Sequence, residues 1–304
     1  MFEKTYDATR FSPLYETEFE SDVQRLLSLF PNGVIAFDLE TTGLSPMVDQ
    51  IIEIGAVKIK ADGGLTCFET LIDPKIKIPE NTIRIHGITN EMVADAPGIT
   101  TALEQFSLFT ENLPLIAHNA KFDVGFFAMQ LQKHALPMTR SQVYCSCKWA
   151  RSLVKNVKNH KLSELALHFQ IPLLHHHRAL DDAFASMLIF ARASKVIDAT
   201  SQLSKAHLYN MENFDPSKME ELPAPLKKLE EWVAISATIE IKYAGGSYKN
   251  QFRPVKILSL LNTPDGNVLY AYCYLGKMHK TFKISKILEV RSMNARDLEF
   301  WLKK

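Results

Sequence analysis

Along the first two thirds of the chain, the spacing of apolar residues alternates between a strand pattern and a helix pattern. Apolar runs rich in β-branched residues predict strands, and apolar side chains three or four residues apart predict helices. The predicted strands cover residues 34–40, 50–61, 65–74 and 114–119. The predicted helices cover residues 21–30, 99–112, 121–134, 146–155, 161–171 and 178–197. Strands first, and then a strand among helices, indicate a layered α/β domain that ends near residue 197.

The last third of the chain has a different pattern. It begins with a stretch that loses the strand pattern and carries three prolines, which we interpret as a linker or bridging segment. Short apolar runs then alternate with Gly-Gly and Pro-Asp-Gly turns, and they predict a small β-rich domain closed by a helix near residues 294–304. The sequence therefore predicts an N-terminal helical extension (1–32), an α/β domain (33–197), a linker (198–234) and a β-rich domain (235–304).

The composition is that of an ordinary globular protein, with 46% apolar and 23% charged residues among 304. No apolar run reaches the roughly 18 residues that a membrane span needs, and the N-terminus has no apolar segment typical of a signal peptide. We therefore expect a cytoplasmic protein without a membrane partner. The four cysteines are scattered and predict neither a zinc site nor a disulfide framework.

Charge is divided unevenly along the chain. Residues 235–304 hold 12 Lys and Arg against 5 Asp and Glu, a net charge of +7, although the whole chain has a net charge of only +1. The rest of the chain is consequently acidic. A basic C-terminal module suits a position near phosphates.

Four carboxylates occupy positions that suggest chemistry. Asp38 and Glu40 are two residues apart on a predicted strand and so project from the same face. Asp123 opens the helix after the strand at 114–119, and Asp182 lies in the first turns of the last helix. Four converging carboxylates repel one another unless cations compensate them, and an all-oxygen site suits Mg²⁺ or Mn²⁺. Two such ions can activate water and stabilise the leaving oxygen of a phosphodiester.

His177 precedes Asp182 by five residues and is a candidate general base, because imidazole titrates near neutral pH. Simpler interpretations remain open at this point. A single Asp at the end of a strand is usually a cap or turn residue. The run His175, His176 and His177 is also typical of a solvated loop or a weak metal-binding tract. Spacing alone does not choose among these alternatives.

Three motifs in order identify a family resemblance. They are "FDLETTGL" at 37–44, "HNAKFDVGF" at 118–126 and "HRALDDA" at 177–183, and the spacer at 78–97 is also similar. On these residues, the chain from about 33 to 195 resembles the DEDDh-type 3′–5′ exonucleases, such as the proofreading subunit of bacterial DNA polymerase III. The resemblance implies a ribonuclease H-like fold with a mixed central sheet flanked by helices.

The resemblance also implies the roles of the site residues. His177 would be the general base, and its alignment with the motif selects it over His175 and His176. Asp181 would be a solvated neighbour. The ligands of two Mg²⁺ or Mn²⁺ ions would be Asp38, Glu40, Asp123 and Asp182. The implied contacts with the end of the nucleic acid are Thr41 and Gly43 (terminal nucleotide), Leu44 (its base), His86 (3′ end), and Asn119 and Phe122 (strand).

The function implied is a metal-dependent 3′–5′ exonuclease that trims single-stranded DNA from its 3′ end and releases nucleoside 5′-monophosphates, in repair or proofreading-type processing. In this scheme His177 takes the proton of the water that attacks the last phosphodiester. An RNA exonuclease is the first alternative, because such relatives share the metal residues. A non-catalytic nucleic-acid-binding regulator is the second. The motifs identify no polymerase partner.

The C-terminal region resembles a WYL domain, a small β-rich module with an Sm-like fold. The resemblance rests on residues 239–246, 252–258 and 267–290, although Asn267-Val268-Leu269 replaces Trp-Tyr-Leu and Lys280-Thr281-Phe282-Lys283 replaces Arg-x-Phe-Arg. Lysine recognises phosphate less specifically than arginine does. Two interpretations stay open, a module that holds DNA or senses a ligand and a solvated basic face with tyrosines in the core. The residues concerned are Arg253, Lys280, Lys283, Lys286, Tyr270 and Tyr272.

Overall fold

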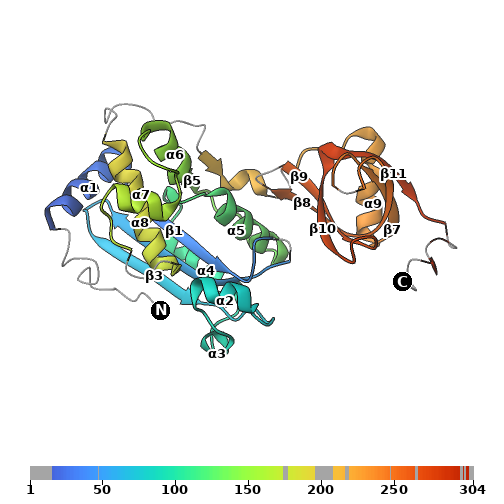
Figure 1. The fold of residues 1–304 in the computed structure, drawn as a ribbon, viewed down its shortest axis with the longest axis horizontal. Coiled ribbons are helices and arrows are strands. Elements are labelled where there is room, and N and C mark those ends of the chain that lie inside the picture. Colours follow the sequence, from blue (N-terminus) through green and yellow to red (C-terminus); the bar gives the residue numbers. More distant parts are fainter. Residues whose placement is uncertain are drawn as a thin grey trace. The chain divides into compact units, whose positions relative to one another are not determined.

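The computed structural model describes residues 16–46, 48–173, 177–195, 208–215, 219–246, 248–263, 266–294, 297 and 299–300. The chain forms two compact units, Met1–Glu212 and Asn213–Lys304 (Figure 1). Each unit has its own sheet and its own apolar core. No helix in the described part of the chain is both long enough and apolar enough to cross a lipid bilayer.

The first unit contains a mixed six-stranded sheet, as the sequence analysis expected. Its strand order is β3-β2-β1-β4-β5-β6, with antiparallel pairing of β1 with β2 and β2 with β3, and parallel pairing of β1 with β4 and β4 with β5. The strands are β1 (Gly33–Thr41), β2 (Ile51–Lys60), β3 (Leu65–Leu71), β4 (Leu115–Ala117), β5 (Gln142–Cys145) and β6 (Leu208–Asn210). The apolar pattern missed β5 and β6 because each is short and, unlike the equally short β4, mixes polar with apolar residues.

Helices flank this sheet (Figure 1). They are α1 (Glu16–Leu29), α2 (Glu80–His86), α3 (Asn90–Val93), α4 (Ile99–Thr110), α5 (Lys121–Lys133), α6 (Ser146–Leu153), α7 (Leu162–His168) and α8 (Ala179–Ser194). Every residue of α8 is buried, because this helix packs on β1 and β2 and is itself covered by α1, α6 and α7. The longest predicted helix is therefore the central helix of the unit.

The two faces of β1 pack against different helices. Val34 and Ala36 belong to the apolar cluster that contains Leu180 of α8. Phe37 points to the opposite side, where its ring lies 5.6 Å from that of Phe106 in α4 and 6.3 Å from that of Phe127 in α5. Because successive strand residues alternate between faces, the even-numbered positions of β1 face α8 as far as the end of the strand.

The second unit contains an antiparallel five-stranded sheet in the order β10-β9-β8-β7-β11. Leu222, Leu226 and Leu229 pack in the core of this sheet, so the unit includes much of the segment that the sequence pattern assigned to a linker. The closing helix expected near residues 294–304 lies largely outside the described residues. The elements are α9 (Lys228–Ala234), β7 (Thr238–Tyr243), β8 (Phe252–Thr263), β9 (Gly266–Cys273), β10 (Met278–Lys283) and β11 (Ile287–Ser292).

Strand β9 shows on which side of the sheet the two tyrosines lie. Leu269, Ala271 and Cys273 point into the core, whereas Tyr270 and Tyr272 are partly exposed on the other face. The tyrosines are therefore not core residues. Arg253, by contrast, is buried, and its guanidinium donates to the carbonyl oxygens of Gly245 and Tyr248, so it is not a surface cation.

In the first unit, α8 approaches the sheet most closely at Gly55, which pairs with Asp38 across β1 and β2. A Cβ atom at Gly55 would lie only 2.1 Å from the backbone nitrogen of Leu180 and 2.3 Å from the carbonyl carbon of Ala179. Since both neighbours are backbone atoms, they cannot rotate away as a side chain can. Glycine at position 55 therefore allows the first turn of α8 to lie directly on β2.

We predict that Gly55→Ala lowers the free energy of unfolding by about 1–3 kcal/mol, because the added methyl group overpacks the contact between β2 and α8. Chemical denaturation of the full chain measures this change. Gly125→Ala is the matched control, since Gly125 lies within helix α5 and the nearest atom to a Cβ there would be 3.7 Å away, an ordinary contact. Equal stability of the two variants would show that the close contact is not maintained in solution.

Candidate active site

Four carboxylates meet where β1, α5 and α8 come together. Asp38 and Glu40 occupy even positions of β1 and so lie on the face that α8 covers. Asp123 is in the first turn of α5 and Asp182 is in the first turn of α8, with exposed fractions of only 2% and 5%. Elements from three distant parts of the sequence thus contribute acids to one site.

The carboxylates are close enough to act on one another electrostatically. Side-chain ligand atoms of Glu40, His177 and Asp182 all lie within 4.8 Å of one another. The charges of Asp123, Asp182 and Glu40 each disfavour ionisation of Asp38. The structure therefore brings together all five residues that the sequence analysis selected as ligands and general base.

The crowding changes the titration of these acids. Burial, followed by the charges of Asp123 and Asp182, raises the pKa of Asp38 well above its ordinary value. Burial and then the charge of Asp182 raise the pKa of Glu40 to about 8, an effect that Arg178 partly opposes. Burial also raises the pKa of Asp123, against hydrogen bonds from its own backbone and that of Leu39. Ionised together, these acids need a compensating positive charge.

Divalent cations fit this donor set. The four acids offer only oxygen atoms, which are the preferred ligands of Mg²⁺ and Mn²⁺, and one imidazole lies beside them. The nearby guanidinium of Arg178 cannot neutralise all four acids, because it already forms an ion pair with Glu53. A thiolate site for Zn²⁺ is not present here, since none of the four cysteines is among the clustered residues.

His177 lies just before α8 in a left-handed backbone conformation, with φ of 67°. Its backbone N–H donates to a carboxylate oxygen of Asp182 at 3.2 Å. His175 and His176 lie outside the described residues. The expectation that Asp181 is a solvated neighbour is wrong, because Asp181 is buried in the fully covered helix α8 and interacts with the charge of Arg178.

Three predicted nucleotide contacts lie at the end of β1 and in the loop after it. Thr41 is buried, and its hydroxyl donates to the carbonyl oxygen of Gly43. A Cβ atom at Gly43 would lie 2.5 Å from the carboxylate of Asp49, so a side chain there would displace this carboxylate, which accepts the N–H of Ser45. Leu44 is 86% exposed, so its side chain is available to a ligand.

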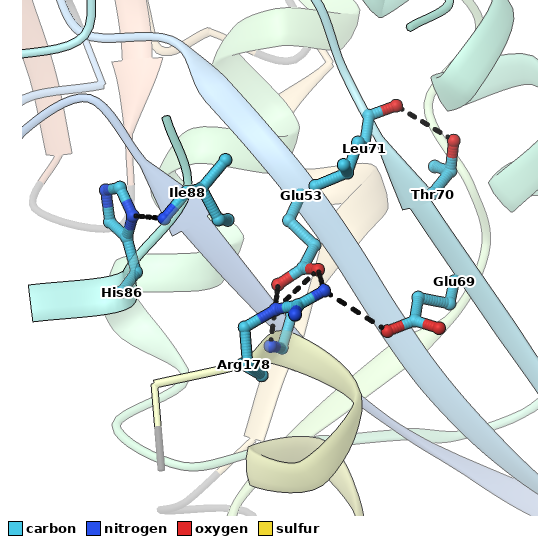
Figure 2. Close-up of polar contacts among 8 residues, drawn as sticks. Glu53, Glu69, Thr70, Leu71, His86, Ile88 and Arg178 are labelled. Atoms are coloured by element: carbon cyan, nitrogen blue, oxygen red, sulfur yellow. Dashed lines mark hydrogen bonds and ion pairs between the residues drawn. The ribbon is translucent and has the colours of Figure 1, made fainter. Parts of the chain in front are cut away.

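The other three predicted contacts come from α2 and from the turn before α5. His86 is buried, and its Nδ1 accepts the N–H of Ile88, so its neutral ring carries the proton on Nε2 (Figure 2). That Nε2 has no hydrogen-bond partner among the described residues. Burial, followed by His177 and Arg178, lowers the pKa of His86. Asn119 is exposed in a left-handed turn, and Phe122 is partly exposed on α5.

The sequence analysis missed two residues beside the acids. Glu53 pairs with Glu40 across β1 and β2 and is fully buried, and its carboxylate accepts hydrogen bonds from the side chain of Arg178 (Figure 2). The signal in the sequence was a lone acid in the apolar run "QIIEIGAVKI". A buried acid of this kind needs a partner, but the sequence does not identify which cation supplies it.

Comparison with known protein families agrees with this geometry. The family model described as "Exonuclease" matches residues 35–190, just over half of the chain. The chain belongs to the exonuclease family. The first unit is accordingly a ribonuclease H-like exonuclease domain with a mixed central sheet, which confirms the fold that the three motifs implied. This fold is of the kind that uses divalent metal ions.

Curated relatives of this exonuclease are much longer proteins. "DNA polymerase III PolC-type" of Caldanaerobacter subterraneus subsp. tengcongensis is 44% identical over 158 residues, which are 52% of this chain and 11% of the relative. The protein of the same name from Clostridium perfringens is 37% identical over 193 residues, 62% of this chain and 13% of the relative. The chain thus spans about a tenth of the length of these relatives.

Solved structures with a similar fold include exonucleases. "Exonuclease X in complex with 5′ overhanging duplex DNA" is 27% identical, with a TM-score of 0.43, and the match covers 54% of this chain and 92% of that one. The nuclease domain of 3′hExo, "a DEDDh family member, bound to rAMP", is 19% identical, with a TM-score of 0.48 and coverage of 57% and 97%. Both matches cover most of the other chain and about half of this one.

The raised pKa of Glu40 predicts how stability depends on pH and on metal. Between its ordinary value of 4.5 and about 8, the folded chain holds a proton that the unfolded chain has lost, so stability falls as pH rises through this window. Divalent cations bind the ionised acids and oppose this loss. We predict that Mg²⁺ at about 100 times its Kd stabilises the chain by about 2.7 kcal/mol near pH 8. The stabilisation by the same concentration of Mg²⁺ should be much smaller near pH 5.

Thermal unfolding with Mg²⁺ or with EDTA at the two pH values measures this difference. Asp123→Asn is the control, because it removes one of the interacting charges and should reduce the effect of Mg²⁺. Equal stabilisation by Mg²⁺ at both pH values would contradict a site made of crowded, partly protonated acids.

Proposed function

We propose that this chain is a metal-dependent 3′–5′ exonuclease that removes nucleotides from the 3′ end of single-stranded DNA. The observation that supports it best is the convergence of four acids and one histidine, from β1, α5 and the start of α8, at a single, partly buried site. Structural packing does not need this arrangement, since burial and then mutual repulsion raise the pKa values of Asp38 and Glu40.

Asp38, Glu40, Asp123 and Asp182 would hold two Mg²⁺ or Mn²⁺ ions in this proposal. Bound ions of this type lower the pKa of water and stabilise negative charge on the leaving oxygen of a phosphodiester. The remaining chemistry belongs to side chains of the chain itself.

His177 would act as the general base. A nitrogen of its ring lies within 4.8 Å of the carboxylates of Glu40 and Asp182, close enough to take the proton of a water that attacks the phosphodiester beside these acids. The nearby carboxylates stabilise the imidazolium that forms when the ring takes the proton. Cleavage of the last phosphodiester then releases a nucleoside 5′-monophosphate.

The residues around the acids suit a strand end. Leu44 offers an exposed apolar surface for the terminal base, and the backbone around Thr41 and Gly43 would contact the terminal nucleotide. The Nε2–H of His86 is an unused donor beside His177, which suits the 3′ hydroxyl. Asn119, in the turn before α5, and Phe122, in its first turn, would hold the nucleotides that precede the 3′ end.

DNA is the preferred substrate in this proposal because the curated relatives are named DNA polymerases. An RNA 3′–5′ exonuclease is the alternative, and a non-catalytic nucleic-acid-binding regulator is a third. The presence of Asp38, Glu40, Asp123, His177 and Asp182 at one site favours an enzyme over a regulator. Repair or proofreading-type processing is the proposed context, with no polymerase partner assigned.

The second unit would bind single-stranded DNA. Tyr270 and Tyr272 project from the outer face of β9, with the ring of His279 stacked on Tyr270 at 5.5 Å. Lys256 on β8 pairs with Tyr272 and is exposed on the same face. Aromatic rings interleaved with cations bind single strands by stacking and by phosphate contacts, whatever the base sequence. A WYL-like assignment for this unit remains part of the proposal.

Asp38→Ala should lower Mg²⁺-dependent nucleotide release by at least about 10³-fold, because several kcal/mol of transition-state stabilisation depends on the ions that Asp38 helps to hold. End-labelled single-stranded DNA, duplex DNA, mismatched DNA and RNA are the substrates to compare. Glu104→Ala, at an exposed position of α4, is the control. Unchanged release by Asp38→Ala would rule out this site, and faster digestion of RNA would favour the alternative substrate.

Tyr272→Ala should weaken binding of single-stranded DNA by about 1–3 kcal/mol, the usual contribution of one stacked base. Lys256→Ala should reduce the slope of log affinity against log salt concentration by about one. Fluorescence anisotropy over a salt series measures both. Lys249→Ala, an exposed lysine in the turn before β8, is the matched control. If neither affinity nor slope changes, the outer face of β9 does not bind DNA.

A further inference from the structure

We propose that Glu53 and Arg178 are positioning residues that lock the start of α8 against β2 and thereby fix His177 and Asp182 beside Glu40. The inference rests on the proposed nuclease function and extends it to two residues outside the set of metal ligands. We call this pair, with the backbone N–H of Ala179, the Glu53 clamp.

The contacts of the clamp occupy both oxygens of one buried carboxylate. Oε1 of Glu53 accepts from Nη2 of Arg178 at 2.6 Å and from its Nε at 3.1 Å (Figure 2). Oε2 accepts from the backbone N–H of Ala179 at 2.9 Å. Glu53 is fully buried, so water does not reach its carboxylate, whereas the side chain of Arg178 is 34% exposed. With both oxygens occupied, Glu53 is suited to holding α8 and not to binding an ion.

The clamp also replaces a missing helix cap. Arg178 is the N-cap residue of α8, and its own side chain makes no capping hydrogen bond. The first N–H groups of a helix have no partner within the helix and carry partial positive charge. Glu53 supplies the missing acceptor to Ala179, the first residue of α8, from a different strand. The position of the helix start is therefore set by β2.

His177 and Asp182 are attached directly to this fixed point. The backbone N–H of Asp182 donates to the carbonyl oxygen of Arg178 at 3.0 Å, and that of His177 donates to the carboxylate of Asp182 at 3.2 Å. His177 also adopts a left-handed backbone conformation, which a non-glycine residue keeps only where its surroundings impose it. Holding Arg178 in place therefore fixes the residues on both sides of it.

Arg178 also compensates the negative charge of Glu53. Glu53 is the cross-strand neighbour of Glu40, and like charges in that position repel. The positive charge of Arg178 compensates the charge of Glu53, with which it forms an ion pair. Arg178 also contacts Glu69 of β3 at 3.6 Å. Without its partner, the charge of Glu53 would add to the repulsion among the acids at the site.

Four variants of the full chain test the clamp: Glu53→Gln, Arg178→Gln, Arg178→Lys and the double variant Glu53→Gln/Arg178→Gln. Glu69→Gln is the matched control, because it weakens the longer contact of Arg178 and leaves its pair with Glu53 in place. For each chain the experiment measures kcat and KM on end-labelled single-stranded DNA with Mg²⁺, Mn²⁺ affinity by electron paramagnetic resonance, and the melting temperature.

We expect Glu53→Gln and Arg178→Gln to lower kcat or Mn²⁺ affinity by about 10–100-fold, the usual cost of losing a partner that orients metal ligands. KM for DNA should stay within about twofold. Arg178→Lys should recover part of the loss, because it restores the charge but not the forked geometry. The double variant should be no worse than the single variants, since both residues act through one interaction.

Two results would overturn the clamp. One is full kcat and full Mn²⁺ affinity in folded Glu53→Gln and Arg178→Gln. The other is a double variant with wild-type kcat, which would mean that only the orphaned charge, and not the lost positioning, harms the single variants. A wild-type chain that neither binds Mn²⁺ nor cleaves DNA would instead overturn the proposed function. The two failures are therefore distinguishable.

Discussion

The repulsion among buried carboxylates is the constraint on which the active site depends. Burial raises the pKa values of Asp38, Glu40 and Asp123, and the charges of neighbouring acids raise those of Asp38 and Glu40 further. A protein that needed only stability would replace some of these acids by apolar residues. Their presence at one end of β1, α5 and α8 is explained if cations complete the site.

The rest of the first unit holds these acids together against that repulsion. Helix α8 is buried along its whole length and therefore cannot move away from β1 without exposing the core. Gly55 lets its first turn lie directly on β2, and Glu53 fixes that turn through Arg178 and Ala179. Packing and hydrogen bonds thus offset an electrostatic cost at the site, as is common where function and stability compete.

Much of this arrangement follows from local sequence patterns. The two-residue period of a strand puts Asp38 and Glu40 on one face, and helix starts after strand 114–119 and near residue 178 bring Asp123 and Asp182 to the same end of the sheet. The mixed sheet and the family are confirmed. The motifs therefore predicted which side chains gather at the site.

Other features depend on register and packing, which a local pattern does not contain. Glu53 faces Glu40, and Gly55 lies under α8, only because β1 and β2 pair with one particular alignment. Asp181 looked like a surface residue, but α8 is covered on every side. Arg253 looked like a surface cation, yet carbonyl oxygens bind it inside the second unit. In each case the deciding partner is distant in sequence.

The most direct test of the central claim is a crystal structure of the full chain with Mn²⁺ and a single-stranded DNA 3′ end, with the ions located by anomalous scattering. The account predicts two Mn²⁺ ions among Asp38, Glu40, Asp123 and Asp182, with the last phosphodiester beside them and the ring of His177 facing it. Mn²⁺ bound elsewhere, or a DNA end that avoids this cluster, would contradict it.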